Sequence, residues 1–175
     1  MTAVPGKSGT GLIMNSPGEF RVLVTEDGSL TVFSSEYEQA MHTLSGALEE
    51  SRVKYVHASG LSARRTGESI SVLDVGFGLG YNVLALYEHC RQQGPDCAVV
   101  SLERDNSYLA ELERVAEVFG SGAYASIADM FRGREFRDEG FSARIAWGDA
   151  RKSVRLLRES GFRADYVFQD AYSPG

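Results

Sequence analysis

The sequence predicts an α/β fold built on a parallel, doubly wound sheet that follows a β-hairpin and a helix. Segments typical of strands and of helices alternate from residue 69 to the last residue. The strand segments are almost continuously apolar, as expected for strands that are covered on both faces. A glycine-rich turn joins the first of these strands to the first helix, which is the arrangement of nucleotide-binding units. The 175 residues are enough for one such domain with a substantial core.

The region before this sheet is expected to have two parts. Residues 1–18 are rich in Gly, Ser and Pro, which predicts a flexible lead-in. Residues 19–68 are predicted to form a hairpin and a helical cap, because two β-rich runs flank Asp27-Gly28, a pair suited to a tight turn. The helical pattern after the hairpin is broken, and Gly60 is expected to end it.

The alternating region covers residues 69–175. The predicted segments are a strand at 69–75, a helix at 81–93, a strand at 97–103, a helix at 107–119, a strand at 143–149, a helix at 150–161 and a strand at 164–170. The polar stretch from 121 to 140 predicts only a short helix near 125–131. A complete doubly wound domain usually has roughly five or more strands. Residues 69–175 are therefore interpreted as the incomplete front part of such a domain, with the fourth strand as an exposed edge.

Composition argues against several classes of protein. The net charge of −6, with 24 acidic and 18 basic residues, argues against a surface that binds nucleic acid broadly. No apolar run approaches the ~20 residues needed to span a bilayer, and the N-terminus lacks the pattern of a signal peptide. We therefore expect no membrane partner. Cys90 and Cys97 have no metal-ligand spacing, so we expect two free thiols in a cytoplasmic protein, and no metal. His42, His57 and His89 are expected on helices, show no partner pattern and are interpreted as ordinary packing or surface residues.

The turn sequence VLDVGFGLGYN, residues 72–82, indicates which nucleotide it holds. Dinucleotide folds use G-x-G-x-x-G, but in Gly76-x-Gly78-x-Gly80 the third glycine comes one residue early. Asp74, two residues before the first glycine, would repel a pyrophosphate by on the order of 1 kcal/mol or more. S-Adenosylmethionine carries a sulfonium and an ammonium and no phosphate, so an acid here would attract it. The turn therefore predicts S-adenosylmethionine as the ligand.

Three further acids support this interpretation. Glu103 ends the second strand, where a carboxylate can accept both ribose hydroxyls, and Asp149 follows the third, where it can accept from the adenine amino group. Asp170 ends the fourth strand. The acids thus fall at the carboxyl ends of consecutive strands, the edge at which open α/β sheets bind ligands. An alternative remains open, because Glu103 and Asp149 are also suited to cap helices and Asp170 to close a turn.

Three stretches of the sequence resemble those of a known protein family. They are DGSLTVFSSEY, then GALEESRVKYVHASGL running into the glycine turn, and YVFQDAYSP. From about residue 19 onward, the chain resembles class I S-adenosylmethionine-dependent methyltransferases, and within them the methyltransferase domain of the MnmC family and its stand-alone relatives. That family completes the methylaminomethyl group on the wobble uridine of certain tRNAs. The resemblance implies a Rossmann-like sheet with strand order 3-2-1-4, S-adenosylmethionine without a metal, tRNA as the substrate, and association with a separate oxidoreductase domain.

The resemblance also implies roles for single residues. Asp170 would hold the acceptor amine and help it lose a proton, and Tyr172 would stack on the target base, with Ser173 and Pro174 shaping the loop. Glu50 or Arg52 would help close the cofactor pocket. The predicted catalytic residues are therefore Asp170 and Tyr172. The predicted cofactor-binding residues are Asp74, Gly76, Phe77, Gly78, Gly80, Asn82, Glu103, Gly148, Asp149 and Glu50.

Other interpretations remain open. Arg151, Arg155 and Arg158 share a helix face, which is either solvated or a patch for RNA phosphates. An aminopropyltransferase of the spermidine synthase type has a similar sheet, but it favours a second acid in the glycine loop, where this chain has GFGLG. A non-catalytic domain that binds cofactor, or binds a partner through the fourth-strand edge, is the alternative from another class. A nicotinamide-dependent oxidoreductase is disfavoured by the glycine spacing and by Asp74.

Overall fold

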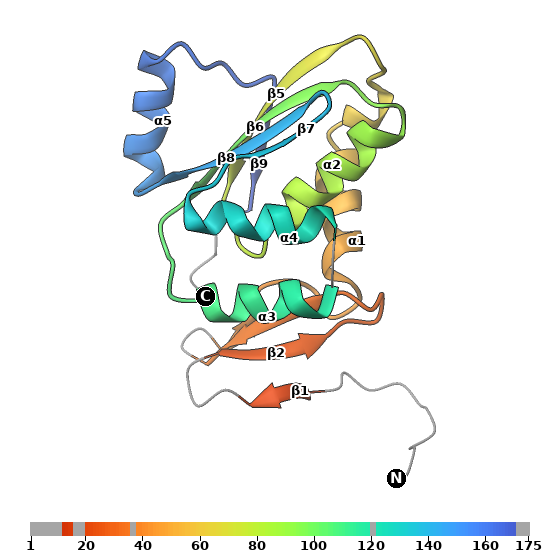
Figure 1. Ribbon diagram of the computed structural model, residues 1–175, viewed down its shortest axis with the longest axis vertical. Helices are drawn as coiled ribbons and strands as arrows, with labels where there is room; N and C mark the ends of the chain where they lie inside the picture. Colours follow the sequence, from red (N-terminus) through yellow and green to blue (C-terminus); the bar gives the residue numbers. More distant parts are fainter. Residues whose placement is uncertain (1–11, 16–19, 36–37, 120–121, 171–175) are drawn as a thin grey trace.

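The structure, a computed structural model, describes residues 12–15, 20–35, 38–119 and 122–170, whose strands form two sheets (Figure 1). The N-terminal sheet is antiparallel and contains, in order, β1 (Leu12–Asn15), β2 (Phe20–Val24), β3 (Leu30–Ser34) and β4 (Gln39–Ala40). The larger sheet contains, from edge to edge, β7 (Phe136–Asp138), β8 (Phe141–Trp147), β6 (Asp96–Glu103), β5 (Ser69–Val75) and β9 (Tyr166–Gln169).

The predicted hairpin is present as β2 and β3. Gly28 adopts φ 82° in its turn, and Asp27 Oδ1 accepts hydrogen bonds from Thr25 Oγ1 (2.6 Å) and Ser29 N (2.9 Å). The prediction of a lead-in without regular structure is wrong for Leu12–Asn15, which pair with β2 as strand β1. This pairing depends on the partner strand, so local composition does not indicate it.

The helical cap changes its winding along its length. It starts as α1 (Ala47–Ser51), continues as the π-helix η1 (Arg52–His57), and is followed by the 3₁₀ turn η2 (Leu61–Ala63). Gly60 has φ 76°, the left-handed conformation expected of a glycine that ends a helix. The switch to π geometry accompanies the broken helical period of the sequence.

The parallel strands of the larger sheet have the order β8-β6-β5-β9, which is the predicted order 3-2-1-4. The predicted α/β fold class is therefore confirmed. At the β8 edge the structure adds β7, which pairs with β8 in the antiparallel sense and lies in the stretch for which the sequence predicted only a short helix. That helix is present as α4 (Ala123–Ala128), followed by the 3₁₀ turn η3 (Asp129–Arg132).

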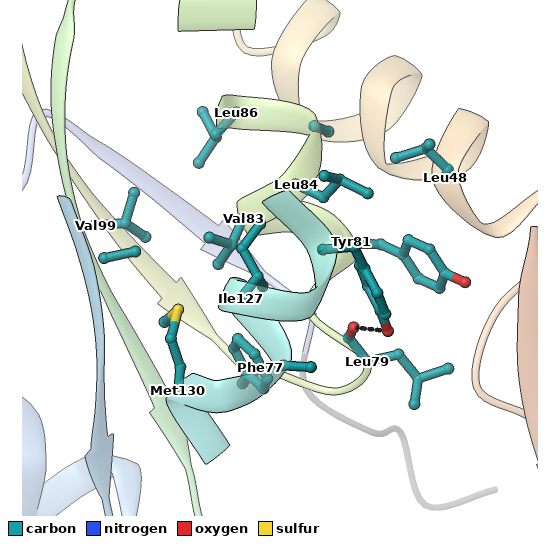
Figure 2. Packing of buried hydrophobic residues seen from close by; sticks show 14 of the residues in the cluster. Leu48, Phe77, Leu79, Tyr81, Val83, Leu84, Leu86, Val99, Ile127 and Met130 are labelled. Carbon is teal, nitrogen blue, oxygen red and sulfur yellow. Dashed lines mark hydrogen bonds between the residues drawn. The ribbon is translucent and has the colours of Figure 1, made fainter. Parts of the chain in front are cut away.

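Helices cover the two faces of the larger sheet unequally (Figure 1). The main core lies on the face covered by α2 (Tyr81–Gln93) and α4, while α3 (Leu109–Phe119) lies between α4 and the N-terminal sheet. Figure 2 shows side chains of this core from the glycine turn, α2 and α4 packed together. On the opposite face, α5 (Ala150–Glu159) packs Leu157 against Leu73, Val100 and Leu102. Within the described residues, no helix is long and apolar enough to cross a membrane.

Candidate functional site

A cleft of about 410 Å³ lies where the carboxyl ends of the parallel strands meet the N-terminal sheet. One wall comes from the N-terminal region and includes Phe20, Met41 and His42. The opposite wall comes from the strand ends and includes Gly76, Gly78, Glu103, Gly148, Asp149 and Asp170. The topology thus brings together residues that are far apart in the sequence, at the edge where open α/β sheets bind ligands.

The glycine turn between β5 and α2 depends on backbone conformations that favour glycine. Gly76, Gly78 and Gly80 have φ angles of 94°, 54° and 79°. Gly80 packs tightly, since an ideal Cβ there would lie 2.9 Å from Phe77 Cζ and 3.0 Å from Ile127 Cγ2, whereas one on Gly78 would meet nothing within 4 Å. Phe77 is only 2% exposed and directs its side chain into the core, so only its backbone is left for the turn (Figure 2).

Asn82, in the first turn of α2, connects two of the predicted acids. Its Nδ2 donates to Asp74 Oδ1 and to Asp170 Oδ2, each at 3.1 Å. Asp74 also accepts from Ser101 Oγ at 2.8 Å and is 0% exposed. Asp74 therefore lies beneath the cleft, and Asn82 links it to Asp170, which lines the cleft.

Burial raises the pKa of Asp74 to about 7. The hydrogen bonds from Ser101 and Asn82 oppose this shift, while the nearby charges of Asp170 and Glu103 add to it. Near neutral pH the Asp74 carboxyl is thus divided between its charged and neutral forms. The neutral form lessens the repulsion that two neighbouring carboxylates would otherwise exert on each other.

Glu103, at the end of β6, is fixed by four hydrogen bonds. Its Oε2 accepts from Gly78 N at 3.2 Å and from Tyr108 Oη at 2.8 Å. Its Oε1 accepts from the backbone N–H groups of Arg104 (2.7 Å) and Asp105 (2.9 Å). Glu103 does not cap α3, because that helix begins at Leu109. Its carboxylate instead connects Gly78 of the glycine turn with the residues that follow β6.

Asp149 is the N-cap of α5, so the helix-cap alternative describes its structural role. Its Oδ1 accepts from the Arg151 backbone N–H at 2.9 Å, and the Arg151 guanidinium binds both carboxylate oxygens. The side-chain and backbone hydrogen bonds from Arg151 lower the pKa of Asp149. The preceding Gly148, with φ 123°, donates its N–H to Glu103 O at 2.8 Å, so both residues stay against the cleft.

Asp170 follows β9 and donates its backbone N–H to Val75 O at 3.0 Å. Two residues that sequence reasoning did not select lie near its carboxylate. Tyr55 of η1 donates to Gln169 O at 3.2 Å, and burial, together with the Asp170 charge, raises the pKa of its hydroxyl. His42 lines the same cleft, and its sequence position gave no signal of this.

His42 lies in the segment between β4 and α1, and it is not in a helix. Its Nδ1 lies 3.2 Å from Thr31 Oγ1, and its ring meets the Tyr81 ring edge-on at 5.1 Å between centroids. Burial lowers the pKa of His42, and Lys54 adds to this, while the charges of Asp170 and Glu50 act in the opposite direction. Burial of the imidazole thus favours its neutral form.

Glu50 of α1 does not line the cleft. It accepts from Thr43 N at 2.7 Å and pairs with Lys54, so it fixes the segment that follows His42. Burial alone would raise the pKa of Glu50, but the hydrogen bonds from Lys54 and Thr43 outweigh burial and lower it. Tyr172, Ser173 and Pro174 lie outside the described residues.

Comparison with known proteins identifies relatives of this chain. No protein-family model matches it. The bifunctional protein MnmC of tRNA 5-methylaminomethyl-2-thiouridine biosynthesis from Aromatoleum aromaticum is 35% identical over 173 residues, which cover 88% of this chain and 25% of that protein. MnmC from Paraburkholderia phytofirmans is 28% identical over 169 residues, covering 87% and 25%.

This chain is similar in sequence to MnmC over most of its own length. The crystal structure of MNMC2 from Aquifex aeolicus supports this, with a TM-score of 0.61 and 29% sequence identity. An uncharacterized protein of Methanocaldococcus jannaschii is 27% identical over 166 residues. The chain spans 25% of the length of the two MnmC relatives and 50% of the MNMC2 chain. The resemblance to the MnmC methyltransferase region is therefore confirmed.

Proposed function

We propose that this chain binds S-adenosylmethionine in the cleft and methylates an amine on the wobble uridine of tRNA in the cytoplasm. The observation that carries the proposal is the position of Asp170, a carboxylate in the cleft that accepts a hydrogen bond at 3.1 Å from Asn82 of helix α2. The names of the MnmC relatives, which place them in the biosynthesis of a methylaminomethyl uridine, support the choice of substrate.

The residues of the cleft fit S-adenosylmethionine in charge and in space. Four carboxylates and two guanidinium groups line it, so its lining is net negative and favours a cationic ligand. Open space above Gly78 leaves room for the aminoacyl arm close to the backbone. Glu103 and Asp149, at neighbouring strand ends, are suited to the ribose hydroxyls and the adenine amino group. When bound, S-adenosylmethionine would supply a methyl group on an already activated, positively charged sulfur.

The chain's own residues would prepare the acceptor. An aliphatic amine is largely protonated at neutral pH and must lose a proton before it attacks. Asp170 can accept a hydrogen bond from the ammonium and then its proton, with Asn82 holding the carboxylate in place. The partly neutral Asp74 behind Asn82 keeps Asp170 from facing a second full charge. The walls of the cleft would align donor and acceptor and exclude water.

A methyl-transfer assay tests this function. The substrates are S-adenosylmethionine with a labelled methyl group and tRNA whose wobble uridine carries an unmethylated aminomethyl group. We expect label in the tRNA, and we expect Asp170→Asn to lower the rate by about 10²–10⁴-fold while S-adenosylmethionine affinity is retained. Asp165→Asn is the matched control, since Asp165 accepts from Ser71 N outside the cleft.

Two results would contradict the proposal. The first is equal transfer by the Asp170→Asn variant and the parent. The second is transfer of an aminopropyl group from decarboxylated S-adenosylmethionine in place of methyl transfer, which would favour the aminopropyltransferase alternative.

A further inference from the structure

Helix α5 carries an exposed band of positive charge that starts at the cleft. The segment 149–163 contains five cations and two carboxylates, although the whole chain has a net charge of −6. Arg151 lines the cleft, and Lys152, Arg155, Arg158 and Arg163 follow it on exposed positions. We call Lys152, Arg155, Arg158 and Arg163, together with Arg151, the α5 basic band.

Three cations of the α5 basic band differ in their partners from most arginines of the protein, and also from Arg151, whose guanidinium pairs with Asp149. Arginines elsewhere, such as Arg64, Arg132 and Arg137, form ion pairs with nearby carboxylates. In the part of the chain that the structure describes, Lys152, Arg155 and Arg158 form no ion pair at all. Unneutralised cations grouped on one helix attract a polyanion, whereas paired ones contribute little field.

The spacing of these cations forms a stripe. Positions 151, 155 and 158 follow the i, i+4, i+7 pattern of one helix face, which spans roughly 10 Å at 1.5 Å per residue. Figure 1 shows α5 alone on its side of the larger sheet, with its outer surface away from the other helices. Arg144 of β8 is exposed and lies on the same sheet face as α5, because Ala146, two residues later, packs into the α5 core cluster.

We propose that the α5 basic band binds the phosphate backbone of the RNA whose modified base enters the cleft. This inference rests on the proposed function and specifies how its substrate is held. Two neighbouring surfaces of the molecule have opposite net charge: the lining of the cleft is net negative, and helix α5, which leads away from the cleft, is net positive. A polyanion that carries a single cationic amine matches both, since the amine suits the cleft and the phosphates suit the helix.

The surface of α5 favours RNA over a lipid bilayer. Its buried residues, Ser153 and Leu157, face the sheet, so the apolar side of the helix is already covered. Only Val154 (41% exposed) and Leu156 (66% exposed) offer apolar surface to solvent, which is too little for a membrane-binding face. Charge is therefore the dominant feature that α5 presents to a partner.

Binding of a labelled tRNA transcript at increasing salt concentrations tests the proposal. The variant Lys152→Gln/Arg155→Gln/Arg158→Gln removes three cations, and Arg65→Gln/Arg134→Gln/Arg137→Gln removes three exposed arginines elsewhere. We expect the α5 variant to bind the transcript at least about tenfold more weakly than the parent at physiological salt. Its slope of log affinity against log salt should be smaller by about 2 to 3, with the control variant close to the parent.

The outcomes separate this proposal from the proposed function. S-Adenosylmethionine affinity and melting temperature, measured on the same preparations, should be equal in parent and α5 variant. Three results would each overturn the assignment. The first is equal tRNA affinity of the parent and the α5 variant, and the second is a loss of tRNA affinity in the control variant equal to that in the α5 variant. The third is tighter binding of the parent to anionic vesicles than to tRNA. Loss of tRNA binding in the α5 variant alone would uphold it even if no methyl transfer were found, in which case only the proposed function would fail.

Discussion

Asn82 Nδ2 lies 3.1 Å from Asp170 Oδ2, although 88 positions separate the two residues in the chain. The start of the first helix after the glycine turn therefore holds the carboxylate that follows the last strand. Because the same amide group also binds the buried Asp74, the position of Asp170 is tied to the interior of the sheet. Function in this protein is expected to depend on that connection.

Replacement of Asn82 by Ala should separate the two carboxylates from their shared donor. We expect a loss of roughly 1–3 kcal/mol in the free energy of unfolding, because a buried acceptor loses its partner. Methyl transfer should fall more than S-adenosylmethionine affinity does. Urea unfolding and the methyl-transfer assay measure the two effects. The exposed Asn106→Ala variant is the control, and an Asn82→Ala variant that behaves like it would contradict the role of the amide.

The buried Asp74 should make stability depend on pH. Its pKa is about 7 in the folded protein against an ordinary value of 3.8, so between these values the folded state holds a proton that the unfolded state has lost. Stability should therefore fall as pH rises from about 4 to about 7, and the contribution of Asp74 should be lost above that. Unfolding by urea at pH 5 to 8 should show this fall, and Asp74→Asn should flatten it. An unchanged profile in that variant would count against the shifted pKa.

Two glycines with similar φ angles should respond differently to substitution by Ala. At Gly80, φ 79°, the new Cβ would clash with Phe77 and Ile127, whereas at Gly28, φ 82°, it would meet nothing within 4 Å. We expect Gly80→Ala to cost about 2–4 kcal/mol of unfolding free energy, and Gly28→Ala about 1–2 kcal/mol from the backbone alone. Equal losses in thermal or urea unfolding would show that packing beneath the turn is looser than described.

Glu103 should matter for ligand affinity. Glu103→Gln keeps the size of the side chain but removes its charge. It also turns an N–H group toward some of the four groups that donate hydrogen bonds to the carboxylate. We expect S-adenosylmethionine affinity to fall by about tenfold or more, since a charged acceptor is replaced by a neutral one. Glu113→Gln, at an ion pair with Arg132 outside the cleft, should leave the affinity unchanged. A similar affinity in both variants would exclude Glu103 from the ligand site.

Local patterns predict the centre of the fold closely. Strand β5 and helix α2 have the predicted bounds, because a continuous apolar run, three glycines and a terminal Gly-Pro pair mark them unambiguously. Strand β7 was missed since its three residues include only one buried side chain, Phe136, and its conformation depends on pairing with β8. Strand β1 was missed because its conformation depends on pairing with β2.

The topology of the sheet allowed part of the site to be predicted. The order of parallel strands follows from topology rules, so Glu103, Asp149 and Asp170 could be expected at one edge. The sequence does not reveal how deeply a side chain is buried, or which residues distant in the chain it contacts. Asp74 lies beneath the cleft, and Tyr55 reaches Gln169 from 114 positions away. No local pattern distinguishes His42 from a histidine that merely fills space.

Titration calorimetry of the chain with S-adenosylmethionine tests the central claim most directly, with NAD⁺ and ATP as competing ligands and Gly78→Val as the variant. The account predicts binding of S-adenosylmethionine, no binding of the two phosphate-bearing nucleotides, and loss of the heat signal in the variant, whose side chain would occupy the open space above the turn. Binding of NAD⁺ or ATP in preference to S-adenosylmethionine, or an unchanged affinity in the variant, would contradict it.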